Sequence, residues 1–100
     1  MISKRMTDRI NEQINREIYS AYLYLAMSAR MTEAGYKGVG KWLMIQYHEE
    51  MFHAMKFLTS LHDRGATVLL KQISAPEFKE TAVKELFQGK QYDCAAIIPV

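Results

Sequence analysis

The sequence predicts an all-α fold, an antiparallel hairpin of two long helices. Apolar residues recur at alternating steps of three and four over two segments, which is the spacing of one face of an α-helix. No proline occurs before Pro76, and glycines gather between the two segments at positions 35, 38 and 40. Because a short connection between long helices makes them antiparallel neighbours, we expect a hairpin.

The composition is that of one small domain. The chain has 100 residues, 49% hydrophobic and 24% charged, and its 13 basic and 11 acidic residues give a net charge of +2. It contains no basic block or stacking motif that would indicate nucleic acid, and no apolar stretch as long as a membrane span. The N-terminus is too polar for a signal peptide, and the single Cys94 favours a reducing compartment. We therefore expect a cytoplasmic protein that binds neither nucleic acid nor membrane.

The first predicted helix runs from about Ser3 to Ala34. One stripe of this helix should face inward: Ile10, Ile14, Glu17, Ala21, Tyr24, Ser28 and Met31. A parallel row should widen the buried face: Ile18, Tyr22, Leu25 and Ala29. Gly35 follows the helix and is expected to cap its C-terminus, since glycine adopts the left-handed conformation that ends many helices.

The second predicted helix has an inward stripe with the same spacing: Val39, Leu43, Gln46, Glu50, His53, Phe57 and Leu61 or Ser60. It should end at Asp63-Arg64-Gly65, where a basic residue precedes a capping glycine. Two other histidines lie off the stripe and should face solvent: His48 and His62. The two helices together form a predicted hairpin domain over residues 1–65.

The remaining residues do not continue this pattern. Residues 66–80 contain Pro76 and should form an irregular crossover, whereas residues 81–100 should form a short incomplete third helix and an irregular tail. A two-helix hairpin cannot cover both of its apolar stripes by itself. We therefore expect association with another chain, most simply as a two-fold pair that completes a four-helix bundle.

Carboxylate and imidazole groups interrupt the inward stripes. Glu17 lies 18 residues before Gly35 and His53 lies 18 residues after it, so antiparallel helices should place Glu17 opposite Glu50 and His53. Charged groups on a buried face need compensation for lost hydration, and a metal ion bound by oxygen and nitrogen supplies it. The pattern indicates a carboxylate-bridged site, in which a carboxylate of the second helix could join two metal ions about 3.5–4 Å apart.

Each of these residues also has a structural interpretation. Glu50 could be a solvated helix residue, His53 a core histidine satisfied by a hydrogen bond, and Glu17 a surface residue in another register. Their presence together on the inward stripes favours the metal site. Tyr24, seven residues after Glu17, could act at that site or be an ordinary buried aromatic, and spacing alone does not distinguish the two.

Two stretches closely resemble bacterial non-haem ferritins: NEQINREIYSAYLYLAMSA at 11–29 and KGVGKWLMIQYHEEMFHAMKF at 37–57. The resemblance covers approximately residues 1–88. It implies that the hairpin is half of a ferritin-like four-helix bundle, and that such bundles assemble into a hollow shell. It also implies a function, in which Fe(II) is oxidised to Fe(III) by dioxygen or hydrogen peroxide and stored as mineral.

The same resemblance implies roles for individual residues. Glu17, Glu50 and His53 would bind the first iron of a di-iron ferroxidase centre, and Glu50 would bridge to the second iron. Tyr24 would lie beside the iron pair as a catalytic residue. Glu49 would be a ligand at a third, neighbouring iron position.

The sequence departs from the family pattern in its last residues. Cys94 stands where the resemblance leads us to expect a third-helix glutamate, and the fourth helix has no counterpart among these 100 residues. Two hypotheses stay open. In the first, the chain is a ferroxidase and iron store whose site is completed between chains by Glu17 and Glu50-x-x-His53 of each. In the second, it is a non-catalytic ferritin-derived helical scaffold that oligomerises without iron turnover.

Overall fold

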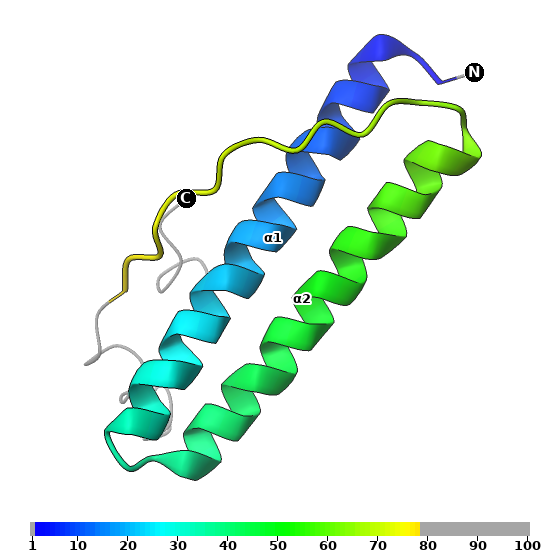
Figure 1. The fold of residues 1–100 in the computed structure, drawn as a ribbon. Helices are drawn as coiled ribbons and strands as arrows, with labels where there is room; N and C mark the ends of the chain where they lie inside the picture. Colours follow the sequence, from blue (N-terminus) through cyan, green and yellow to red (C-terminus); the bar gives the residue numbers. More distant parts are fainter. Residues whose placement is uncertain (1, 79–100) are drawn as a thin grey trace.

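Two long antiparallel helices form the body of the molecule (Figure 1). The structure is a computed structural model that describes residues 2–78. Helix α1 is Lys4–Glu33 and helix α2 is Lys37–Asp63, so the predicted all-α hairpin is confirmed. After α2 the chain turns and runs back in extended form along α1 as far as Phe78 (Figure 1). The expected third helix and tail, 81–100, lie outside the described residues.

Helix α1 begins at a polar cap, close to the predicted position. The Ser3 hydroxyl accepts a hydrogen bond from the backbone N–H of Met6 at 3.2 Å. That N–H is one of the first four in the helix, which have no partner within the helix itself, and a serine cap satisfies one of them. Within residues 2–78, neither helix is both long enough and apolar enough to cross a membrane.

Both helices end in the same glycine motif. Gly35 has φ of +95° and Gly65 has φ of +68°, a backbone conformation that glycine adopts without steric cost. The residue after each glycine donates its N–H back to the helix, to Met31 O at 2.8 Å and to Leu61 O at 2.9 Å. This bonding satisfies carbonyl groups that the helix leaves open, and it confirms the two predicted glycine caps.

The hydrophobic core lies between the two helices and beneath the extended segment. Its buried apolar side chains come from both helices: Ile14, Ala21, Leu23, Tyr24, Met27, Met31, Leu43, Ala54 and Leu61. The predicted inward stripe of α1 is largely correct, because only Ile10 and Glu17 of its seven members are half-buried rather than buried. On α2, Leu43 and Leu61 of the predicted stripe are buried and His53 is exposed.

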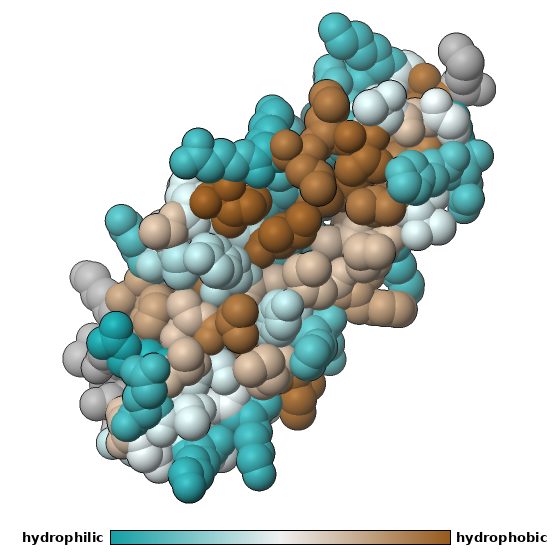
Figure 2. Space-filling model, viewed as in Figure 1, coloured by the Kyte–Doolittle hydropathy of each residue, from teal (hydrophilic) through white to brown (hydrophobic). Residues whose placement is uncertain are grey.

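The predicted second row of α1 is wrong at two of its four positions, whereas Ile18 and Leu25 are half-buried. Tyr22 is 45% exposed, and Ala29 is exposed as well. Leu23 and Met27 are buried in their place, and Phe78 of the extended segment packs against the cluster that contains them. The buried face is therefore widened on the side that this segment covers. Figure 2 shows apolar side chains gathered in the upper half of the face seen in Figure 1.

Two asparagines of α1 hold the extended segment. Asn11 donates from Nδ2 to Thr67 O at 3.0 Å and accepts from Leu69 N–H at 2.8 Å. Asn15 donates to Leu69 O at 3.3 Å and accepts from Lys71 N–H at 3.0 Å. Four helical residues rise about 6 Å, and two residues of extended chain span about 6.5 Å. The two side chains therefore meet alternate residues of the segment, as a neighbouring β-strand would.

Ser28 and Gly40 make a close contact between the helices near their connection. The buried Ser28 hydroxyl donates to Gly40 O at 2.7 Å. A Cβ atom on Gly40 would collide with Thr32 Oγ1 and lie 3.2 Å from Ser28 O. Position 40 therefore needs glycine for reasons of space rather than of backbone angle.

We predict that Gly40→Ala lowers the free energy of unfolding by about 1–3 kcal/mol, because the added methyl overpacks this contact. Gly38→Ala is the matched control, since a Cβ there meets nothing within 4 Å. It should raise the free energy of unfolding by about 0.4–1 kcal/mol through the lower entropy of the unfolded chain. Denaturant unfolding measures both variants, and equal stabilities would contradict the close contact.

We also predict that Asn11→Ala destabilises the fold by about 1–3 kcal/mol, because it leaves the Leu69 N–H and the Thr67 carbonyl without a partner. Asn15→Ala should cost less, since its hydrogen bonds to the segment are exposed whereas those of Asn11 are partly buried. Denaturant unfolding of the two variants tests the order. A larger loss for Asn15→Ala would contradict it.

Candidate metal centre

Glu17 of α1 meets Glu50 and His53 of α2 across the hairpin. One ligand atom of each residue lies within 4.8 Å of the other two. His53 Nδ1 is 3.8 Å from Glu17 Oε2 and 3.9 Å from Glu50 Oε2. The antiparallel arrangement thus brings together the three residues that the residue count placed opposite one another.

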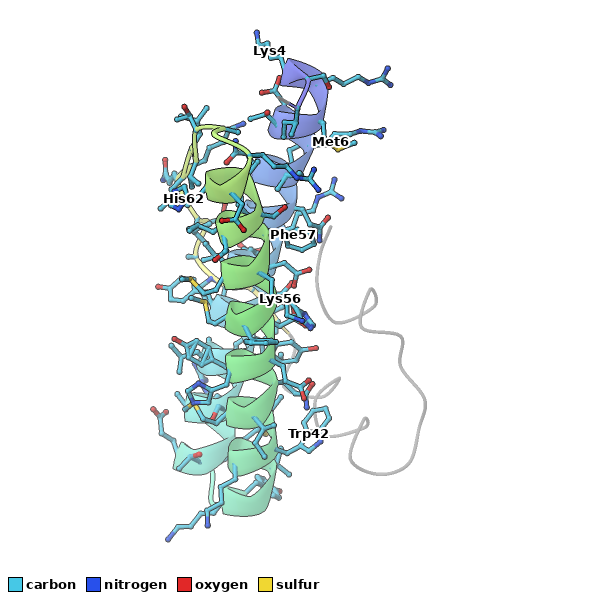
Figure 3. All side chains as sticks on the ribbon, turned by 90° about the vertical axis from the view of Figure 1, so that its right-hand side faces the viewer. Lys4, Met6, Trp42, Lys56, Phe57 and His62 are labelled. Atoms are coloured by element: carbon cyan, nitrogen blue, oxygen red, sulfur yellow. The ribbon has the colours of Figure 1, made fainter. Side chains whose placement is uncertain are left out.

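The two glutamates of this cluster are half-buried, and the cluster is open on the side of His53. Glu50 and His53 are three residues apart and so share one face of α2. The Glu17 and Glu50 side chains are 16% and 24% exposed, whereas that of His53 is 50% exposed. Phe57, one turn beyond His53, projects to the same side of α2 as Trp42 (Figure 3). Because the His53 side chain is half exposed, a cation could reach the cluster from the side of α2 on which His53 lies.

The carboxyl groups of Glu17 and Glu50 lie close enough to repel each other when both are ionised. Burial raises the pKa of Glu50 to about 7, and both its hydrogen bond with Glu17 and the negative charges of Glu17 and Glu49 act in the same direction. Near neutral pH, Glu50 therefore holds a proton much more readily than an ordinary glutamate does. A bound divalent cation would replace that proton and remove the repulsion between the carboxylates.

The two oxygens of the Glu17 carboxylate face different residues. Gln13 Nε2 donates to Glu17 Oε1 at 2.9 Å, while Oε2 faces His53. Gln13 is not among the site residues predicted from the sequence. Its position four residues before Glu17 is the signal that could have found it, because residues four apart on a helix are neighbours.

The other candidate residues lie outside this cluster of three. Tyr24 is 8% exposed and belongs to the hydrophobic core cluster. Glu49 is exposed and lines an open groove of α2 together with His48 and His53. His48 and His62 are exposed, as expected. The catalytic role of Tyr24 and the third metal position at Glu49 stay predictions.

The donor set suits a hard or borderline cation. Carboxylate oxygen with imidazole nitrogen is the combination that iron and similar metals accept, whereas soft metals prefer sulfur. Helical bundles hold di-iron and di-manganese sites with glutamates and Glu-x-x-His pairs that project inward. Fold and cluster together thus define a class, the helical proteins that bind metal through carboxylate and imidazole groups of facing helices.

Comparison with known proteins identifies the family. The ferritin-like domain matches this chain over residues 7–91, and the chain belongs to the ferritin family. The bacterial non-heme ferritin of Staphylococcus saprophyticus is 35% identical over 88 residues, which are 88% of this chain and 53% of the relative. That of Staphylococcus aureus is 33% identical over the same shares. This chain therefore spans about half the length of the curated relatives that it matches.

Solved structures show the same relation. An open pore ferritin from the hyperthermophilic archaeon Archaeoglobus fulgidus matches with a TM-score of 0.75 and 43% identity, over 77% of this chain and 48% of that one. An engineered closed form of the Archaeoglobus fulgidus ferritin matches with a TM-score of 0.78 and 40% identity, over 86% and 54%. The hairpin is thus half of a ferritin bundle.

We predict that the metal-free protein loses stability as the pH rises from about 5 to 8. The folded-state pKa of Glu50 is about 7 and its ordinary value is 4.5, so between these values the folded state binds more protons than the unfolded state. Stability falls with pH wherever the folded state binds more protons. Glu50→Gln should remove this part of the dependence, which urea unfolding at several pH values would measure.

Glu12→Gln provides the control, because Glu12 is an exposed glutamate of the same helix as Glu17. It should keep the pH dependence of the unchanged chain. A Glu50→Gln variant with the same dependence as the unchanged chain would contradict the proton on Glu50.

Proposed function

We propose that this chain binds iron at Glu17, Glu50 and His53, as part of a ferritin-type di-iron centre that oxidises Fe(II) to Fe(III) for storage. The supporting observation is the cluster of two carboxylates and one imidazole within 4.8 Å, on facing helices of a ferritin hairpin. The chemistry of these donors suits ferrous ion. Relatives that share one third of their residues with the aligned part of this chain are non-heme ferritins.

Each residue has a distinct part in the proposed chemistry. Glu17 and His53 hold the first ferrous ion, and Glu50, after losing its proton, bridges to the second. Two ferrous ions at bridging distance each give one electron to dioxygen, which takes up two protons and leaves as hydrogen peroxide. With hydrogen peroxide as the oxidant, the same two electrons and two protons yield two molecules of water.

Tyr24 and Glu49 extend this proposal. Tyr24 lies two helical turns beyond Glu17 and acts beside the iron pair. Glu49, exposed next to Glu50, binds iron at a third position on the outward side of the pair. Its charge already influences the pKa of Glu50, so a cation at Glu49 would favour the ionised form of Glu50.

A second helix pair must supply the remaining ligands, because three side chains do not fill the coordination of two iron ions. We propose that a second copy of this hairpin supplies it. Two copies related by a two-fold axis offer two Glu17 and two Glu50-x-x-His53 sets, which is the ligand set of di-iron carboxylate bundles. Packing against the copy would also cover exposed apolar side chains of α2, such as Ile45 and Phe52, which are 55% and 59% exposed. Such pairs would then assemble further, toward a ferritin-like shell.

We predict that Glu50→Ala abolishes paired iron binding, because it removes both the bridging ligand and one ligand of the first iron. Anaerobic titration with Fe(II), followed by exposure to oxygen with the absorbance recorded, measures stoichiometry and oxidation. The unchanged chain should bind about two irons per pair of chains and oxidise them faster than buffer. Glu12→Ala should behave as the unchanged chain does.

Unchanged stoichiometry in Glu50→Ala would contradict this site. If the unchanged chain binds no iron, or oxidises it no faster than buffer, the chain is instead the non-catalytic scaffold. Gel filtration of the same samples separates a pair of chains from a shell.

A further inference from the structure

Gln13 forms a hydrogen bond with only one of the two oxygens of the Glu17 carboxylate. Its Nε2 donates to Oε1 at 2.9 Å, and the other oxygen, Oε2, lies 3.8 Å from His53 Nδ1. Both side chains are at least partly buried, so water competes less for this hydrogen bond than it would at the surface. One oxygen of Glu17 is therefore engaged within α1, and the other is directed across to α2.

This arrangement has a consequence for a bound cation. A glutamate has three rotatable bonds and can bind a metal through one oxygen or through both. The amide N–H of Gln13 fixes the orientation of the carboxylate and uses a lone pair of Oε1. The N–H group itself cannot bind a cation. Groups that hydrogen-bond to a metal ligand in this way orient the ligand, and their loss typically lowers metal affinity 10–100-fold.

We propose that Gln13 is a positioning residue that makes Glu17 a one-oxygen ligand, with Oε2 toward the metal and Oε1 held by the amide. This inference rests on the proposed iron site. It adds Gln13, one turn before Glu17, to the α1 residues that the family resemblance assigned to the site, Glu17 and Tyr24.

Gln13→Met tests the proposal, because methionine keeps the length and the helix propensity of glutamine but cannot donate to Glu17. Gln72→Met is the control, since Gln72 is an exposed glutamine of the extended segment. Anaerobic titration with Co(II) as a spectroscopic substitute for Fe(II) reports affinity and coordination together. We expect Gln13→Met to bind Co(II) about 10–100-fold more weakly, with a changed visible band because Glu17 can then bind through both oxygens. Gln72→Met should change neither quantity.

Two results would overturn the inference. One is an affinity of Gln13→Met within twofold of the unchanged chain. The other is a weaker affinity with an unchanged band, which would mean a general structural effect rather than a change at Glu17. If the unchanged chain itself binds no Co(II), the proposed iron site fails, and the role of Gln13 fails with it.

Discussion

The contact between Ser28 and Gly40 fixes how far α2 is displaced along α1. The hydroxyl of Ser28 donates to the carbonyl of Gly40 at 2.7 Å, and a Cβ atom on residue 40 would collide with Thr32 Oγ1 of α1. Glu17 lies eleven residues before Ser28, and Glu50 lies ten residues after Gly40, which is about 15–17 Å along each helix. The two carboxylates therefore arrive at the same height, and the candidate metal centre depends on this register.

That register also creates an energetic conflict that a cation would resolve. Burial beside Glu17 raises the pKa of Glu50 to about 7, so near neutral pH a proton competes for the carboxylate that iron would bind in the proposed function. The packing of the two helices, with the Ser28–Gly40 contact between them, keeps the carboxylates together despite their repulsion. Gln13 adds to this by fixing one oxygen of Glu17. Binding sites commonly retain such strain, because the surrounding structure maintains it.

Periodicity predicted the helices and the meeting of Glu17 with Glu50 and His53, because both follow from helical spacing and a short connection. Periodicity did not predict the contacts between α1 and the extended segment, because that segment has no periodic pattern of its own. The hydrogen bonds of Asn11 join it to residues of the extended segment that are 56 and 58 positions away in the sequence. No local sequence pattern predicts such a pairing. Phe78 of the same segment packs against the cluster that contains Leu23, whereas Tyr22, which was expected to be buried, is exposed. Gly40 looked like one of several loop glycines, since its closeness to Thr32 exists only in three dimensions.

Anomalous diffraction at the iron absorption edge, on crystals loaded with Fe(II) without oxygen, would locate the metal directly. We expect iron peaks between Glu17, Glu50 and His53, with a second peak about 3.5–4 Å away on the other side of Glu50. Ligands from a second hairpin should surround that second peak. Iron bound only at other carboxylates, with this cluster left empty, would contradict the proposed di-iron centre.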